Sequence, residues 1–235
     1  MYKNKLCFRN MVALAICFTG MTVFSSCEKD ENENFYCVNT IKSSPKNSSL
    51  SKSEMDVVKY LFNRNQLDYT KYQFTQFQKD ELGHHHIRCF QFANNLLVFT
   101  SDAIFHFDKN DNYYSLSGDL INTLNFNTKP SMKQDDVIEK YIDIVQHDET
   151  FLAYLDILVE IAKVDETVDV IHIEDIIEGC FDVEFGYYDL NASVSYTDEK
   201  YTKAWKINSN KYDYPFAYIN DENSEVIYYD NGIRF

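Results

Sequence analysis

Three consecutive histidines, His84-His85-His86, come closest in this sequence to the residue types and spacing of a metal site. In a β-strand, residues two apart share a face, so His84 and His86 would point the same way. His106, in a later stretch with the alternation of a strand, could add a third imidazole ligand. The competing interpretation is an exposed polar strand that begins beside a turn, and the pattern favours it. We therefore predict no metal site and keep these three histidines as weak candidates.

The motifs of the common catalytic sites are absent. The sequence has no His-Glu-x-x-His, which would place two zinc-binding imidazoles and a general base on one helical face. It also has no Gly-x-Ser-x-Gly turn, phosphate-binding loop or Cys-x-x-Cys pair. Asp102 and Asp108 suit strand ends or turns better than a catalytic carboxylate pair. We predict a protein that is not an enzyme and that needs no cofactor.

The amino-terminal segment has the composition of an export signal. Lys3, Lys5 and Arg9 precede residues 11–26, which are almost all apolar or small and carry no charge. A membrane-spanning helix needs about 20 apolar residues, so this run is short for one. Small residues followed by Cys27 resemble the bacterial lipobox, whose Cys is diacylated and begins the mature protein. Phe24 departs from that pattern, which prefers Leu at this place.

We therefore predict a signal peptide over residues 1–26 and lipid attachment at Cys27. An ordinary secretory signal with a chance Cys, and an uncleaved anchor helix, are the alternatives. Residues 27–31 resemble the signal that places lipoproteins on the outer surface in Bacteroidetes-type bacteria, where Lys and two acidic residues follow the Cys. An acidic spacer without a sorting role remains the alternative. The predicted location is the outer membrane or cell surface, and residues 27–53, polar and poor in aliphatic side chains, are predicted to be a flexible tether.

Charge and cysteine content narrow the possible partners. The chain carries a formal charge of −15, and loss of the three cations of residues 1–26 makes the mature charge −18. Such a chain would be repelled by phosphate backbones, so we expect no nucleic-acid partner. Cys37, Cys89 and Cys180 remain after Cys27, without metal-ligand spacing. They are best interpreted as small buried hydrophobes, with Cys37 in the tether, although a Cys89–Cys180 disulfide is possible in an exported protein.

Hydrophobic periodicity predicts helices followed by strands, twice over, and therefore an α+β fold. A helix capped by Ser53 should precede strands at 72–77, 84–92, 102–108 and 113–117. A second set should begin with a helix capped by Ser131 and another helix over 149–164. Strands at 168–173, 181–191, 201–207, 215–219 and 225–229 should follow. The predicted modules cover residues 54–128 and 131–235, each with helices packed on an antiparallel sheet.

The first module resembles the FTP domain, the propeptide module of fungalysin and thermolysin precursors. The likeness rests on residues 86–91, on Val98-Phe99-Thr100-Ser101, on the strand that ends His106-Phe107-Asp108, and on Ser115-Leu116-Ser117-Gly118. The turn glycine of that family is Asn95 here, and Asn is the commonest non-glycine residue at positive φ.

The second module is similar to the PepSY module that follows FTP in such precursors. Ala204-Trp205-Lys206 resembles its Ala-Trp-Lys strand, and residues 216–228 resemble its closing hairpin, with Asn220 in place of the usual Asp. We expect Trp205 to belong to the core.

Together the two resemblances cover about residues 52–232. Propeptides of this kind help their peptidase to fold and keep it inactive. The resemblance therefore implies a membrane-anchored protein that acts in trans on a separate peptidase, as inhibitor or folding helper, by burying a sheet face or pairing an edge strand. The alternative is a surface binding or structural module that kept the fold without peptidase regulation. Metal capture by the histidines is a third and weaker option.

Overall fold

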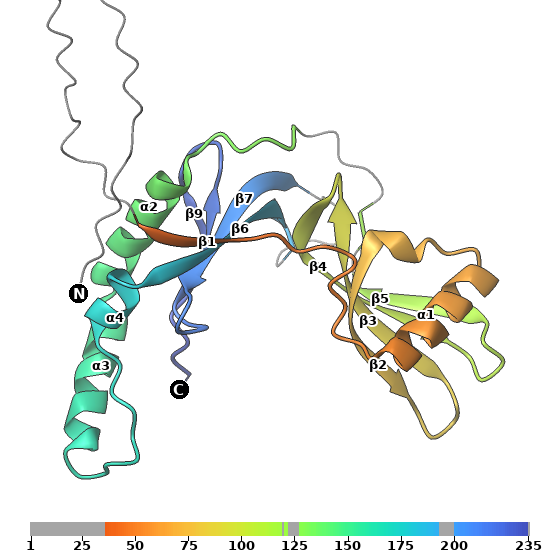
Figure 1. Ribbon diagram of the computed structural model, residues 1–235, viewed down its shortest axis with the longest axis horizontal. Coiled ribbons are helices and arrows are strands. Elements are labelled where there is room, and N and C mark those ends of the chain that lie inside the picture. The colour runs from red at the N-terminus through yellow and green to blue at the C-terminus, as the bar shows by residue number, and fades with distance from the viewer. Residues whose placement is uncertain (1–35, 119, 122–126, 193–199, 235) are drawn as a thin grey trace, which may run out of the picture. The chain divides into compact units, whose positions relative to one another are not determined.

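The computed structural model describes residues 36–118, 120–121, 127–192 and 200–234, which belong to one compact unit, Phe35–Phe235. The fold is α+β, with a mixed and mostly antiparallel sheet and four α-helices (Figure 1). The sheet has nine strands among the described residues, in the order β2-β3-β4-β6-β7-β8-β9, while β5 pairs with β4 and β1 pairs with β6. The predicted signal peptide and Cys27 lie outside the described residues.

The first half of the chain forms a helix on an antiparallel meander. Helix α1 (Lys52–Arg64) precedes β2 (Tyr72–Lys79), β3 (His85–Ala93), β4 (Leu96–Phe107) and β5 (Tyr113–Gly118). The helix buries Val58, Leu61 and Phe62 against one face of this sheet. Phe62 lies at the centre of the cluster, with its ring centroid 4.8 Å from that of Phe105 and 5.2 Å from that of Phe74. The alternation of the strands decides which face is buried, as the sequence predicted.

The second half carries three helices on one side of four strands (Figure 1). Helices α2 (Gln134–Gln146), α3 (Glu149–Ala162) and α4 (Ile173–Ile177) precede the antiparallel strands β6 (Cys180–Asp189), β7 (Tyr201–Ser209), β8 (Phe216–Asn220) and β9 (Val226–Asp230). The core between them contains Tyr141, Phe181, Trp205 and Ile207. Trp205 is only 4% exposed, so its predicted place in the core is confirmed.

A short parallel contact joins the two halves of the sheet. Leu97 and Val98 of β4 pair with Gly186 and Tyr187 of β6. A side chain at residue 186 would not fit, because an added Cβ would lie 2.4 Å from the Leu97 carbonyl oxygen and 2.8 Å from the Phe99 ring. Gly186 therefore allows β4 to approach β6 closely and the Phe99 ring to lie over the junction.

The predicted tether is wrong for part of its length. Cys37–Ile41 form strand β1, which pairs in parallel with β6, and Cys37 forms a disulfide with Cys180. Cys180 is thus bonded to Cys37 and not to Cys89, which is a free, buried cysteine. The low aliphatic content of residues 28–53 concealed the strand, because a covalent bond and backbone pairing hold β1 where hydrophobic burial alone would not.

Other differences from prediction are local. Ser51, not Ser53, caps α1: its hydroxyl accepts from the Glu54 amide while the Glu54 carboxylate accepts from the Ser51 amide, which is a capping box. Helix α2 begins after Lys133 and not at Ser131. No strand forms over residues 168–173, where the chain instead enters the short helix α4. Short apolar runs such as Val168–Ile173 do not distinguish a strand from a helical turn by periodicity.

Within the described residues, no helix is long and apolar enough to cross a membrane.

Candidate functional site

The face of β2–β5 opposite α1 carries the histidines that the sequence singled out. His86 on β3 and His106 on β4 are direct cross-strand neighbours, and their Nδ1 atoms lie 2.7 Å apart. The outer nitrogens are held as well, because His86 Nε2 lies 3.3 Å from an Asp80 carboxylate oxygen and His106 Nε2 lies 2.9 Å from the Ser117 hydroxyl. His84 precedes β3, with its Nδ1 3.5 Å from the same Asp80 carboxylate. Asp80, His86, His106 and Ser117 thus form a hydrogen-bonded row across the sheet, which we call the histidine row.

This geometry suits a hydrogen bond between imidazoles better than metal chelation. Two imidazole nitrogens bound tetrahedrally to one zinc ion would lie roughly 3.3 Å apart, given zinc–nitrogen distances near 2.0 Å. The described residues contain no group of three or more His, Cys, Asp or Glu side chains that could hold a metal ion. His84 lies just before β3 and not within it, but its ring and that of His86 face the same Asp80 carboxylate oxygen, at 3.5 and 3.3 Å.

Proton occupancy of this row is restricted. A hydrogen bond between the two Nδ1 atoms needs one ring to donate and the other to accept, so both rings cannot carry a charge while it lasts. Burial, and then the neighbouring His86, lower the pKa of His106. Burial opposes ionisation of Asp80, but hydrogen bonds from the His84 amide and the His86 ring outweigh it, and the pKa of Asp80 is lowered. The row therefore favours a neutral His106 ring and an ionised Asp80 carboxylate.

An ion pair lies beside the histidines on the same face. The Nε atom of Arg88 donates to an Asp102 carboxylate oxygen at 2.7 Å, and a second guanidinium nitrogen contacts the other oxygen. Asp102 is thus within strand β4, which begins at Leu96, and its predicted position at a strand end is wrong. Asp108 is a turn residue as predicted, since its carboxylate accepts hydrogen bonds from the amides of Asn110 and Asn112.

Several residues of the predicted FTP-like pattern have positioning roles. The buried Gln91 side chain forms two hydrogen bonds with the backbone of Ile121, at 2.7 and 2.8 Å. The backbone amide of Gln91 donates to the Ser101 hydroxyl. Asn94 and Asn95 form the tight turn between β3 and β4, with φ of 51° and 63°, so the prediction of positive φ at Asn95 is confirmed. Gly118 has φ of 89°, and a Cβ there would lie 2.2 Å from the Asp102 carbonyl oxygen.

Asp221, which sequence reasoning missed, organises the second half. Its buried carboxylate accepts hydrogen bonds from the Trp205 ring at 2.9 Å and from the amides of Ser131 and Met132. The ammonium group of Lys203 lies 2.9 Å from it. These contacts fix the β8–β9 turn and the approach to α2 onto strand β7. The resemblance to the PepSY closing hairpin could have pointed to this residue, because that hairpin has an Asp after its first strand. Asn220, and not Asp221, was matched to that Asp.

A second face free of described helices lies on the other side of β6–β9. Lys206 lies 5.6 Å from the centroid of the Phe216 ring, and Arg234 lies 5.6 Å from that of Tyr214. Neighbouring aromatic rings on this face have centroids 4.9 to 6.4 Å apart. The rings of this aromatic face belong to Phe99, Tyr188, Tyr214, Phe216, Tyr218 and Tyr228. Such rings offer large, rigid contact area to a partner.

Comparison with known families bears on the first half of the chain. The family described as the fungalysin/thermolysin propeptide motif matches residues 71–120. The matched segment runs from the start of β2 to just beyond β5, so it includes the histidine row, the Arg88–Asp102 ion pair and Gly118. This confirms the propeptide-like resemblance for that segment. A search of curated proteins found no match.

Proposed function

We propose that this protein is a non-catalytic lipoprotein of the cell envelope that acts in trans on a separate peptidase, as its inhibitor or folding helper. The match of residues 71–120 to a peptidase propeptide motif carries this proposal. The likeness of residues 131–235 to a PepSY module belongs to the same proposal. It is supported by the order of α2–α4 before four antiparallel strands and by the buried contact of Trp205 with Asp221.

Export and anchoring through Cys27 are part of this proposal. The Cys37–Cys180 disulfide supports them, because such bonds form and persist in oxidising compartments outside the cytosol. The outer membrane or cell surface is the location that the residues after Cys27 favour.

The open face of β2–β5 is the contact surface that we assign to this function. It lies within the matched segment, and no described helix covers it. Ile104 lies near its middle, paired with Arg88 on one side and Ser117 on the other. An apolar side chain that becomes buried, bordered by charged side chains such as the Arg88–Asp102 pair, is a common arrangement in protein interfaces.

The test is inhibition of a thermolysin-type zinc peptidase from the same organism by residues 28–235, which contain the whole compact unit. We expect inhibition at micromolar protein and at least about tenfold weaker inhibition by the Ile104→Asp variant. Tyr60→Ser is the matched control, because Tyr60 is 51% exposed on α1, away from this face. Refolding of the denatured peptidase with and without the protein tests the folding-helper role.

Failure of the protein to affect either the activity or the refolding of any such peptidase would contradict the proposal. The aromatic face of β6–β9 supports a second candidate, a surface binding or structural module, because that face lies outside the matched residues. A pull-down from surface extracts that recovers one stable partner and no peptidase, and that fails with Tyr228→Ser, would favour this second function.

A further inference from the structure

Helix α3 is apolar around most of its circumference, which is unusual for a helix at a protein surface. Its only charged residues are Glu149, Asp156 and Glu160. One face packs inward, with Phe151 and Leu155 buried and Leu158 packed against the core. A surface helix normally turns polar residues outward on the remaining face. On α3 the exposed polar residues are Glu149, Thr150, Asp156 and Glu160, and the other large exposed side chains are apolar. Packing against the core of this chain does not explain these exposed apolar residues.

The outward apolar residues form a single stripe. Tyr154 is 38% exposed, Ile157 55%, Ile161 41% and Val164 86%. They follow one another at intervals of three and four residues, so they lie on one side of the helix. Val164 continues the stripe past the end of α3, because its amide and that of Asp165 both donate to the Ile161 carbonyl. A contiguous exposed apolar stripe of this kind marks an interaction surface.

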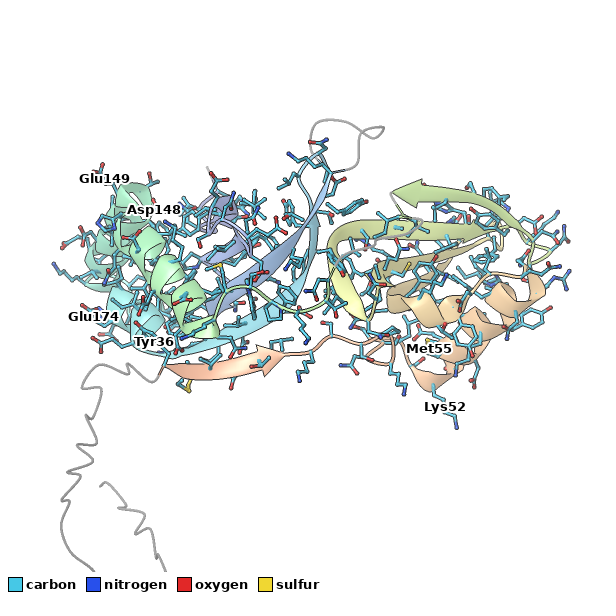
Figure 2. All side chains as sticks on the ribbon, turned by 90° about the horizontal axis from the view of Figure 1, so that it is seen from above. Tyr36, Lys52, Met55, Asp148, Glu149 and Glu174 are labelled. Carbon is cyan, nitrogen blue, oxygen red and sulfur yellow. A yellow bond between two sulfur atoms is a disulfide. The ribbon has the colours of Figure 1, made fainter. Side chains whose placement is uncertain are left out.

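The segment that carries the α3 stripe is strongly acidic. Residues 148–178 contain ten acidic residues and one basic residue, a net charge of −9. The single cation, Lys163, is paired with Glu160 at 2.5 Å, and the nearby Lys211 is paired with Asp175 at 2.9 Å. Figure 2 shows Asp148, Glu149 and Glu174 among the helices of this end of the chain. The segment that carries the stripe therefore has acidic charge that these two cations leave largely uncompensated.

We propose that the α3 stripe binds a partner protein that presents an apolar ridge bordered by Lys and Arg side chains. Charge distinguishes three possible occupants of the stripe, which are a basic partner protein, a second copy of this chain and an anionic membrane. A second copy of this chain would bring two acidic segments together, and an anionic leaflet would repel the same segment. A partner protein with Lys and Arg beside its apolar ridge would instead be attracted and oriented by this acidic charge. This surface lies outside residues 71–120, so the inference does not depend on peptidase binding.

The test uses a designed helical peptide of about 18 residues with Leu on one face and Lys on the flanks. Its charge-reversed counterpart, with Glu in place of Lys, is the matched probe. Calorimetry with residues 28–235 should show binding of the basic peptide that weakens severalfold between about 50 mM and about 500 mM salt. The acidic peptide should bind at least about tenfold more weakly.

The variant that carries the test is Ile157→Gln together with Ile161→Gln. Both side chains are exposed and Gln is a good helix former, so we expect the thermal unfolding of the variant to be unchanged. It should lose at least about tenfold of the affinity for the basic peptide, while Tyr60→Gln on α1 keeps it.

Three outcomes overturn the inference. Equal binding of the basic and acidic peptides would remove the role of charge. Unchanged binding by the double variant would place the peptide elsewhere. Sedimentation that shows a dimer of the wild-type chain, dissociated by the double variant, would make a second copy the occupant.

Discussion

At the scale of single residues, the most consequential side chain is a buried carboxylate that the sequence did not single out. Asp221 is 1% exposed. Its carboxylate accepts hydrogen bonds from the Trp205 ring and from two backbone amides, and it pairs with the Lys203 ammonium group. Burial opposes its ionisation, but the hydrogen bonds from Met132, Lys203, Ser131 and Trp205 outweigh burial and lower the pKa of Asp221. These contacts therefore stabilise the carboxylate in its charged form.

We expect Asp221→Asn to destabilise the fold by about 3–5 kcal/mol, because it leaves Lys203 buried without its counter-ion. Urea unfolding at neutral pH measures this loss. Asp213→Asn is the control, since Asp213 is exposed and its replacement should change stability by less than about 0.5 kcal/mol. Equal stabilities of the two variants would show that the buried pair contributes nothing.

The histidine row gives a pH dependence whose sign follows from the lowered pKa of His106. A group with a folded pKa below its unfolded value of 6.5 contributes stability above that value and loses it as pH falls through the folded pKa. Protonation of both rings would also break the bond between His86 and His106.

We therefore expect wild-type stability to fall between about pH 7.5 and about pH 5, and His106→Gln to flatten that fall. Urea unfolding across this range makes the measurement. His147→Gln is the control, because His147 is exposed and outside the row. A His106→Gln variant with the same pH profile as wild type would rule out a role for the row.

At the scale of elements, β1 depends on a covalent bond more than on burial. Four of its five residues are exposed, yet the strand pairs along β6 and the disulfide closes a loop between Cys37 and Cys180, 143 residues apart. Long loops restrict the unfolded chain most when they are closed. The disulfide thus contributes stability mainly through the unfolded state.

We expect Cys37→Ser with Cys180→Ser to lower the free energy of unfolding by about 2–5 kcal/mol. Denaturant unfolding of the oxidised wild type and the double variant measures the difference. A reductant should lower the stability of the wild type to that of the variant and leave the variant unchanged. Cys89 does not interfere, because burial and then the Asp102 charge raise the pKa of its thiol to about 12.

Comparison of the predicted and observed elements shows which parts of the fold can be inferred from the sequence. Strands β2 to β5 and helix α3 were predicted near their observed positions because alternation and helical spacing record which face is buried. Strand β1 and the disulfide partner of Cys180 were not, since both depend on segments 143 residues apart in sequence. The link of Asp221 to Ser131 was also hidden, because a buried polar contact leaves no periodic pattern.

At the scale of the whole molecule, the disulfide shortens the tether that the sequence predicted. If lipid is attached at Cys27, nine residue steps separate the anchor from Tyr36, where the described chain begins. An extended chain spans about 3.4 Å per residue, so this separation is at most about 30 Å, against about 90 Å for a tether that ended at residue 53. The folded unit would stay near the membrane, and a peptidase partner would have to reach it there.

Lipid attachment at Cys27 is the prediction on which this placement depends. Cells grown with labelled palmitate should incorporate label into the wild-type protein and not into Cys27→Ala, which should leave the membrane fraction. Cys17→Ala is the matched control, because it removes a cysteine from the same amino-terminal segment and should keep the label. Cys37 offers no second attachment site, since its sulfur is bonded to Cys180. Label or membrane association that survives Cys27→Ala would overturn the anchor, and with it the limit on where a partner can bind.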